Sequence, residues 1–534
     1  MCFRDSINFY NSGLDKLMDN LAKTAPDGNL AAVFPHVAAT HPELQPEALT
    51  VERRVLLRKH FAPEKSDCTE EDYWKWTWSL LLRKLPMPFK RMQSTDMWSM
   101  PAVWADEAYE SELKTVKAEE IALLRETAAI MGWSTFQQVH DCYLHMDLCL
   151  ADVMEAFRTA FFSKFGLDPL QYVTLPSAAY DAMLKSCLTQ RPARLITDSG
   201  IYRTVRSSIM GGLSCAFQTY AKANSPELGP GKWNEDEDRS YLLQMDISSM
   251  YPYIMTMPMP ASSGETLSLP EGRAERLAWV KQQLAEIDFK RSDETECLLF
   301  VVDFSFPCHL HDYLDWAPPC KMTVEPELLS EYSRKVMQEN GLTPGKVAKL
   351  VPFLGRHCKE GVDGKRLAFM VQIMGARIER VHEAIRFKCA PFLSAWMKGI
   401  YDERLLMKKQ KRTVEAEMLK LVMNAIYGKL IQNVEGFKNS QVYTSSSSFV
   451  RAANGRRMQD MDVFFGEGEF LGVVHSVDKQ VRQKSLVQAG WRVLELSRLQ
   501  MLMNHYLGMK HLFPDAVVTL TDTRSEERRV GKEC

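Results

Sequence analysis

The pattern of hydrophobic and polar positions divides the chain into a helical first part and a mixed remainder. Over residues 136–165, apolar side chains recur at steps of three and four residues, which predicts an amphipathic helix. The glycine- and proline-rich stretch 223–240 is polar and predicts a loop or a boundary. We therefore expect a mostly helical region up to about residue 200, followed by a region that contains strands.

Three later segments have the apolar composition of buried strands, and two of them end in an aspartate. The first strand ends in Asp246, and the last ends in Asp522. Between the strands, residues 392–431 have a helical pattern, and Thr413 is expected to cap the second of two helices. The three predicted strands are 241–246, 297–306 and 516–523.

Composition places the chain among ordinary globular proteins. It has 534 residues, of which 46% are hydrophobic and 25% charged, and at about 150 residues per domain this length suggests three or four domains. Because the net charge is −2, any binding of nucleic acid must depend on local patches of positive charge. Twelve irregularly spaced cysteines favour a reducing, intracellular location. The sequence contains no apolar run of about 20 residues, so we predict no membrane span.

The two aspartates suggest metal chemistry, although an aspartate at a strand end is more often a turn residue. Mg²⁺ prefers carboxylate and carbonyl oxygens and substrate phosphates. Two carboxylates on adjacent strands can hold two ions roughly 3.5–4 Å apart, one activating a hydroxyl nucleophile and one stabilising the leaving pyrophosphate. Asp246 and Asp522 suit these tasks, and the carbonyl of Ile247 can add an oxygen.

The helix that contains Lys420 supplies groups for a nucleoside triphosphate. At 100° per residue, Asn424 lies about 40° and Tyr427 about 20° from Lys420 around the helix axis, so the three share one face. Lys420 would meet the phosphates as a point charge, and Asn424, Tyr427 and Gly428 would pack near the base. Tyr251 would lie under the sugar and leave no room for a 2′-hydroxyl.

Three segments, which contain Asp246, Lys420 and Asp522, resemble the motifs of a known family and occur in the family's order. DISSMYP (246–252) resembles motif A of family B DNA polymerases, with Met250 in place of Leu. KLVMNAIYG (420–428) resembles motif B, with Ala425 in place of Ser, and TLTDT (519–523) resembles the first half of motif C. The resemblance is closest to the protein-primed branch of adenovirus-like, linear-plasmid and Polinton-like polymerases, and it covers most of residues 1–523.

The resemblance implies an α/β (α+β) fold, in which an exonuclease-like domain precedes a polymerase palm with an antiparallel sheet and helical fingers, and the thumb is missing. The implied divisions are a partial 3′–5′ exonuclease-like domain (1–200), a linker (201–240), a palm with an insertion (241–390), fingers (391–432), the rest of the palm up to motif C (433–523) and a tail (524–534).

Site residues follow from the same resemblance. Asp246, Asp522 and Lys420 are the implied catalytic residues. Asp5, Tyr143 and Asp147 match exonuclease motifs, and a first exonuclease motif should precede Asp5, so the N-terminus is expected to be cut off. Gly211 and Gly212 match an element that guides single-stranded template. The implied nucleotide-binding residues are Ile247, Ser249, Met250, Tyr251, Arg404, Asn424, Tyr427 and Gly428.

The implied cofactors are two Mg²⁺ or Mn²⁺ ions, and the implied partners are template DNA, dNTPs and a terminal protein that supplies the priming hydroxyl. Residues 260–295 and about 315–365 are candidate insertion material for contact with that protein. A membrane partner is not expected.

The C-terminal end departs from the family. Arg524 stands where motif C should have a second aspartate. The last eleven residues, 524–534, resemble the translation of a sequencing adapter, so we expect Thr523 to be the last native residue. We expect negligible DNA synthesis from this chain and synthesis from the intact product.

Other functions remain as alternatives. The chain could be a degenerate, non-catalytic DNA-binding protein of a mobile element, or a nuclease acting alone. A reverse transcriptase or RNA polymerase is disfavoured by Tyr251 and by the pattern of the helix that contains Lys420. The basic run 408–412 is either a phosphate contact or a solvated turn. The spacing of Cys308, His309, His311 and Cys320 does not match a usual zinc arrangement.

Overall fold

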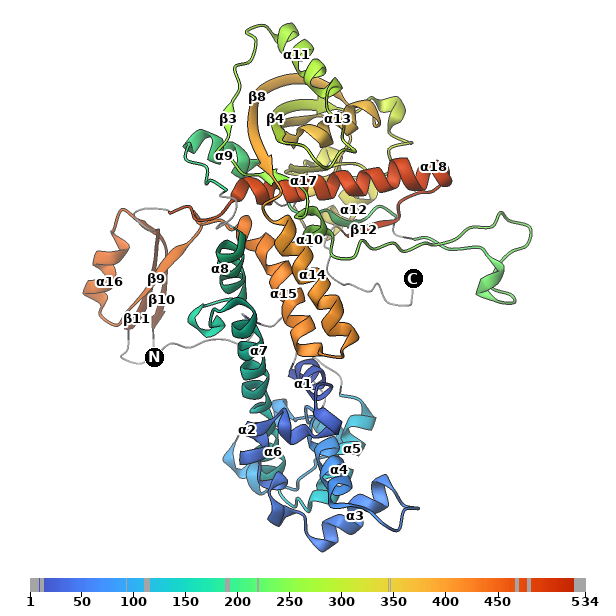
Figure 1. Ribbon diagram of the computed structural model, residues 1–534, viewed down its shortest axis with the longest axis vertical. Helices are drawn as coiled ribbons and strands as arrows, with labels where there is room; N and C mark the ends of the chain where they lie inside the picture. The colour runs from blue at the N-terminus through green and yellow to red at the C-terminus, as the bar shows by residue number, and fades with distance from the viewer. Residues whose placement is uncertain are drawn as a thin grey trace. The chain divides into compact units, whose positions relative to one another are not determined.

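The computed structural model describes residues 9, 14–92, 94–109, 116–187, 193–218, 220–343, 345, 347–465, 470–477 and 482–522 (Figure 1). Contacts within the chain group the residues into two compact units. The first unit is 1–182 with 399–423, and the second is 183–398 with 424–534. Each unit has its own core and is treated separately below.

The first unit is helical. The predicted amphipathic stretch 136–165 forms two helices rather than one, because the chain turns at Leu148 and both helices bury an apolar face. A capping box between Thr135 and Gln138 starts the first of them. The helices between residues 14 and 187 are α1 (Leu14–Ala22), α2 (Pro35–Thr40), α3 (Val51–Phe61), α4 (Glu70–Leu81), α5 (Ala118–Met131), α6 (Phe136–Asp147), α7 (Cys149–Phe165) and α8 (Leu175–Cys187).

A five-stranded antiparallel sheet is the centre of the second unit. Its strands follow the order β2-β8-β4-β7, and β3 pairs with β8 beside this path. The predicted strand 297–306 is confirmed as β4, which is almost entirely buried between its neighbours. The strands are β2 (Met259–Pro260), β3 (Glu265–Thr266), β4 (Glu296–Ser305), β7 (His357–Asp363) and β8 (Arg377–Ala390).

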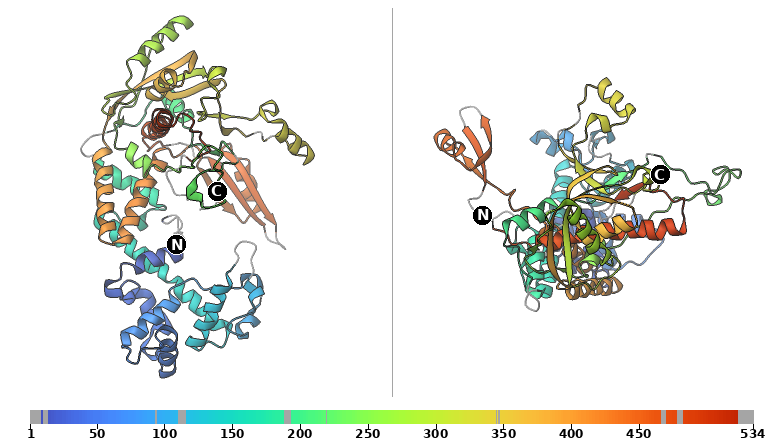
Figure 2. Two further views of the ribbon diagram at one scale, coloured as in Figure 1. Left: turned by 90° about the vertical axis from the view of Figure 1, so that its right-hand side faces the viewer. Right: turned by 90° about the horizontal axis from the view of Figure 1, so that it is seen from above.

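Helix α17 (Val487–Met503) runs along the sheet and is buried on nearly all sides. It lies beneath the sheet in Figure 1 and is seen almost end-on in the left view of Figure 2. It also contacts α9 (Ser199–Ser207) and α13 (Gly364–Gln372). Apolar side chains from these elements make one core, which consists of Ile196, Ile201, Val205, Cys297, Leu299, Ile385, Phe387, Val487 and Trp491.

The other elements form smaller sheets and further helices. A three-stranded sheet in the order β10-β11-β9 carries helix α16 on one face, where Phe449 packs against Phe470. The remaining elements are β1 (Ser214–Ala216), α10 (Met250–Ile254), α11 (Arg273–Ala285), β5 (Pro319–Met322), α12 (Glu331–Glu339), β6 (Lys349–Pro352), α14 (Ser394–Lys409), α15 (Thr413–Leu430), β9 (Lys438–Tyr443), α16 (Ser446–Ala453), β10 (Met458–Phe465), β11 (Phe470–Val477), α18 (Lys510–Leu512) and β12 (Leu520–Asp522).

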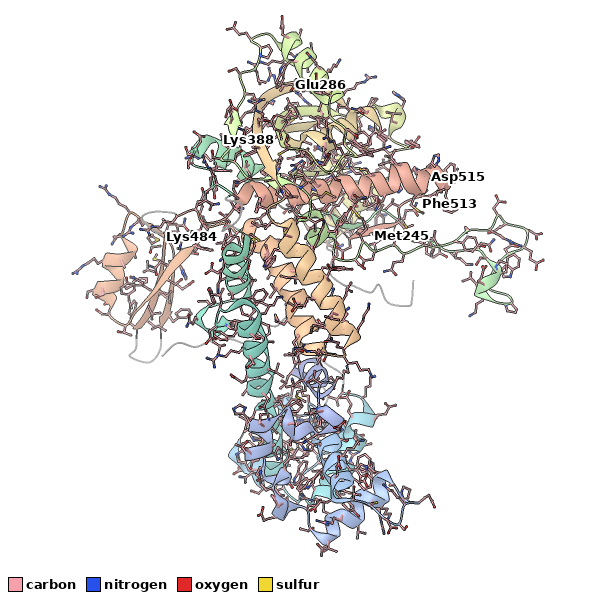
Figure 3. All side chains as sticks on the ribbon, viewed as in Figure 1. Met245, Glu286, Lys388, Lys484, Phe513 and Asp515 are labelled. Atoms are coloured by element: carbon pink, nitrogen blue, oxygen red, sulfur yellow. The ribbon has the colours of Figure 1, made fainter. Side chains whose placement is uncertain are left out.

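The predicted strand at 241–246 is wrong. These residues lie outside any strand, and their apolar side chains are exposed; Met245, labelled in Figure 3, is 64% exposed. A strand needs a neighbour for its backbone N–H and C=O groups, but β12 pairs with β1 instead, with Ser214 opposite Asp522. Residues 241–245 have the apolar composition of a strand, but no strand in the described part of the chain pairs with them.

The mixture of helices and antiparallel sheet confirms the predicted α+β class. No helix in the described part of the chain is long and apolar enough to cross a membrane.

Candidate functional site

The site begins at a sharp turn before α10. Ser249 adopts a left-handed conformation with φ of 55°, which is uncommon for a residue with a side chain and strains the backbone. The turn ends the exposed segment and starts α10, whose Met250 and Ile254 point into the core. Tyr251 is thereby held at the edge of the core, half-buried.

Tyr251 contacts Tyr427, which joins two segments that lie far apart in the sequence. The ring centroids are 4.4 Å apart and the rings are tilted by 42°. Burial raises the pKa of the Tyr427 phenol well above its ordinary value, the neighbouring Tyr251 raises it further, and the positive charge of Arg498 acts in the opposite direction. The Tyr427 phenol therefore stays protonated at neutral pH.

A small hollow lies beside this aromatic pair. Gly212 comes from the predicted template-guiding element, Met250 and Tyr251 come from α10, and the rest of the wall comes from α17. The lining residues are Gly212, Met250, Tyr251, Leu494, Ser497, Arg498 and Met501. The structure thus brings together two of the predicted segments, residues 211–212 and 250–251.

The structure does not bring the two predicted metal-binding aspartates together by any described contact. Asp246 is exposed in the segment before α10, and Asp522 is exposed at the end of β12. The described hydrogen bonds and ion pairs do not join Asp246 to Asp522, so their meeting stays a prediction. Two carboxylates and the carbonyl of Ile247 are hard oxygen donors, and this donor chemistry fits Mg²⁺ or Mn²⁺.

Helix α15 is continuous from Thr413 to Leu430. Lys420, Asn424 and Tyr427 therefore lie on one side of it, as the sequence predicts. Lys420 is half-buried, with its Nζ 3.9 Å from a Glu417 carboxylate oxygen. Gly428 is exposed, and a Cβ added there would meet nothing within 4 Å. Thr413 is the first residue of the helix rather than its cap.

Two further predicted features lie on α14 and in the turn after it. Arg404 is half-buried, and its Nε has no hydrogen-bond partner among the described residues. The basic run 408–412 is exposed over the end of α14 and the turn before α15, where Lys411 has φ of 61°. Arg412 forms an ion pair of 2.9 Å with Glu415, so part of this positive charge is neutralised within the chain.

The predicted exonuclease residues lie on α6 in the first unit. Tyr143 and Asp147 are one helical turn apart, and the Tyr143 ring meets Phe89 edge-on at 6.3 Å. Partial desolvation raises the pKa of Tyr143, and the nearby Asp147 raises it further. Partial desolvation also raises the pKa of the Asp147 carboxyl, although the positive charge of Lys84 acts in the opposite direction. Asp5 lies outside the described residues, so the exonuclease assignment stays a prediction.

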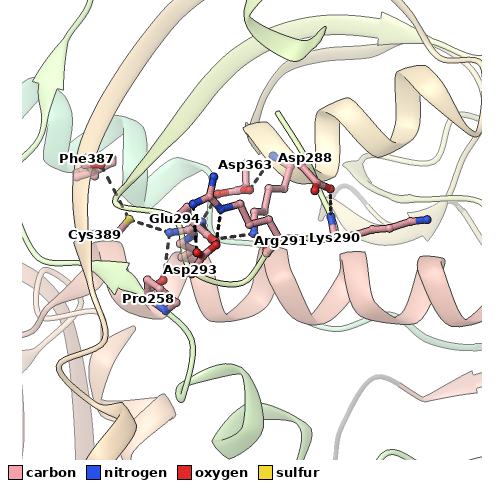
Figure 4. A network of polar contacts seen from close by, with 11 residues as sticks. Pro258, Asp288, Lys290, Arg291, Asp293, Glu294, Asp363, Phe387 and Cys389 are labelled. Carbon is pink, nitrogen blue, oxygen red and sulfur yellow. Dashed lines mark hydrogen bonds and ion pairs between the residues drawn. The ribbon is translucent and has the colours of Figure 1, made fainter. Parts of the chain in front are cut away.

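Sequence reasoning missed a buried ionic network on α17. Glu495 has a fully buried side chain that accepts hydrogen bonds from Arg366 at 2.8 Å and Arg498 at 2.7 Å. Arg492, on the same helix, pairs with Glu294 and Asp363; Figure 4 shows this neighbourhood. The signal was present in the sequence, because charged residues recur at three-residue steps (492, 495, 498) within a stretch that is mostly apolar.

One group of potential metal ligands occurs among the described residues, and it differs from the set rejected in the sequence. It consists of Cys320, His357 and Glu360. Both ring nitrogens of His357 are already engaged, with Glu360 at 2.6 Å and the Phe353 carbonyl at 2.9 Å. We therefore interpret the group as a buried ion pair.

Comparison with known proteins gives one family match. Residues 106–289 match the family model of type B DNA polymerases of organellar and viral origin, which confirms the predicted resemblance to family B polymerases. The matched range includes Gly211, Gly212 and the whole of α10. Comparison with curated proteins finds no match.

Solved structures of phi29 DNA polymerase are similar at a low level. The ternary complex with primer-template DNA and incoming nucleotide substrates has 11% identity and a TM-score of 0.38, over 74% of this chain and 53% of that one. The binary complex with primer-template DNA has 13% identity and a TM-score of 0.38, over 83% of this chain and 58% of that one. The chain thus spans little more than half the length of these polymerases.

Proposed function

We propose that the chain is the core of a DNA-directed DNA polymerase of family B, and that its priming mode is protein priming. The reaction is attack of a primer 3′-hydroxyl on the α-phosphate of a dNTP, with release of pyrophosphate. The observation that carries the proposal is the contact of Tyr251 with Tyr427 beside a hollow that Gly212 also lines, because three separate segments of the family's pattern meet there.

The chain's own residues have defined tasks in this reaction. The Tyr251 ring forms the floor for the sugar and excludes a 2′-hydroxyl, while Tyr427, Asn424 and Gly428 border the base. Lys420 and Arg404 neutralise the triphosphate, whose negative charge grows on the leaving oxygens. Ser249 and Met250 shape the turn that holds Tyr251 in place.

Divalent ions complete the proposed site. Asp246, Asp522 and the Ile247 carbonyl would hold Mg²⁺ or Mn²⁺, which lowers the pKa of the attacking hydroxyl and stabilises pyrophosphate when bound. Both carboxylates lie at exposed positions.

The proposed partners follow from the same assignment. Template DNA would pass along Gly211 and Gly212, and a terminal protein would contact the segments 260–295 and 315–365. Proofreading would use Asp5, Tyr143 and Asp147.

A binding experiment tests the proposal on the 534-residue chain. Fluorescence anisotropy would measure its affinity for primer-template DNA, and a fluorescent dATP would measure nucleotide affinity with and without Mg²⁺. We expect both to bind, with nucleotide binding dependent on Mg²⁺ and weakened at least about tenfold in Asp246→Asn. Asp238→Asn, an exposed aspartate in the preceding loop, serves as the matched control.

Further outcomes separate the alternatives. Loss of discrimination between dATP and ATP in Tyr251→Val supports the sugar floor. DNA binding without any Mg²⁺-dependent nucleotide binding would favour the degenerate DNA-binding protein, and absence of both would exclude the proposal. Because Arg524 stands in place of an aspartate, we expect negligible primer extension, and robust extension would contradict that expectation.

A further inference from the structure

A single buried arginine holds the predicted template-guiding element in place. Arg498, on α17, is 6% exposed. Its Nη2 donates hydrogen bonds to the carbonyls of Met210 and Gly211, the latter at 2.7 Å, and its Nη1 donates to Glu495 at 2.7 Å. The guanidinium therefore joins the backbone just before Gly212 to the interior of the second unit.

The arginine is itself fixed from behind. Glu495 accepts from Arg498 through one carboxylate oxygen and from Arg366 and the Asp363 backbone N–H through the other. Arg366 continues to Glu360 at 3.0 Å on β7. This chain of buried charges ties the position of Arg498 to the sheet.

The held backbone faces open space. Met210 is buried, whereas Gly211 is exposed and a Cβ added to it would meet nothing within 4 Å. Packing within the chain therefore does not require a glycine at this position. The next residue, Gly212, lines the hollow with Arg498 and Tyr251, so the clamp sets how this backbone is presented beside the aromatic floor.

We propose that Arg498 is a positioning residue, which fixes the 210–212 backbone beside Tyr251 and thereby presents it to single-stranded template DNA. The assignment to template rests on the proposed function, whereas the clamp itself rests on the contacts above. The planar fork of the guanidinium is essential, because it bonds two carbonyls and a carboxylate at once. A lysine retains the charge but offers a single ammonium and cannot span the three acceptors.

Hydrogen exchange tests the clamp without any assumption about activity. The reporter is a peptide covering 209–218, because its β1 amides pair with β12 directly after the clamped carbonyls. In the 534-residue chain we expect exchange in this peptide to accelerate on the order of tenfold in Arg498→Met and in Arg498→Lys. The matched control is Arg492→Met, which removes another buried arginine from the same helix. Its contacts are with Pro258, Cys389, Glu294 and Asp363 rather than with Met210 or Gly211.

A second measurement addresses the ligand. Anisotropy with a single-stranded oligonucleotide should show affinity reduced about tenfold in Arg498→Met and Arg498→Lys. If Arg498 has only a general structural role, exchange in the 209–218 peptide should accelerate equally in the Arg492 and Arg498 variants, and Arg498→Lys should restore slow exchange. Either result would overturn the proposal. If the unsubstituted chain fails to bind DNA, the proposed function fails, while the exchange comparison still decides whether Arg498 is a clamp.

Discussion

The neighbourhood of α17 and the segment 241–246 are both apolar in sequence, yet they have opposite fates in the structure. In the first, Tyr251, Tyr427 and Arg498 are held by ring contacts and by hydrogen bonds from a buried helix. In the second, Leu243 is 65% exposed and Asp246 follows it at the surface. The difference shows that apolar composition specifies structure only where a partner surface exists, whereas charged groups can be buried where every acceptor is satisfied.

The largest effect is expected from breaking the buried network. Glu495→Gln leaves Arg366 and Arg498 buried with reduced compensation, so the free energy of unfolding should fall by about 3–5 kcal/mol. Urea denaturation followed by circular dichroism measures this loss. Asp293→Asn, which breaks an ion pair with Arg291 in which both side chains are mostly exposed, is the control and should cost nothing measurable. Equal losses in both variants would mean that burial of the network has no energetic weight.

The second prediction concerns pH and the histidine at the far end of this network. Burial lowers the pKa of His357, but hydrogen bonds to Cys320 and Glu360 and the charge of Glu360 outweigh it and raise the pKa to about 9. The folded state therefore binds a proton that the unfolded state releases near pH 6.5. This stabilisation is complete below pH 6.5 and is lost as pH rises through about 9.

The expected size of this loss is about 3 kcal/mol, from 1.36 kcal/mol for each pKa unit. Urea denaturation at pH 6.5 and pH 9.5 measures it, and His357→Gln is the control because it removes the titrating group. A slope with pH that persists unchanged in His357→Gln would assign the effect to other residues.

A smaller effect is expected at Gly428, which tests the base-binding side of the aromatic pair. An alanine is accommodated without a clash and favours the helix, so stability should rise by up to about 1 kcal/mol. If the incoming base approaches this position, nucleotide affinity should fall in the same variant. Gly399→Ala is the matched control, because Gly399 is also helical and exposed and a Cβ there meets nothing within 4 Å. A fall in affinity in both variants would remove Gly428 from the proposed site.

The smallest effect is expected in the exposed segment. Leu243→Ser should change the free energy of unfolding by less than about 0.5 kcal/mol, because the side chain is already in water. Leu299→Ala, at a fully buried leucine of β4, provides the contrast and should cost about 2–5 kcal/mol. A loss of several kcal/mol in Leu243→Ser, measured by urea denaturation, would show that 241–246 packs as a strand in solution.

The sequence by itself determined the elements whose apolar periodicity already shows which face is buried. The helical character of 136–165 and 392–431 and the strand at 297–306 follow from apolar periodicity, whereas the division of 136–165 into two helices at Leu148 does not. The shared face of Lys420, Asn424 and Tyr427 also follows, since it requires only an unbroken helix. The resemblance to family B polymerases rested on short motifs, and the match of residues 106–289 confirms it.

Only the tertiary structure decided which segments meet. β12 pairs with β1 rather than with residues 241–246, and strand pairing depends on what lies alongside in space, which no local pattern encodes. The clamp of Arg498 on Gly211 joins positions 287 residues apart. A charged side chain in an apolar helix signals that a partner must exist, but only the folded chain shows which backbone supplies it.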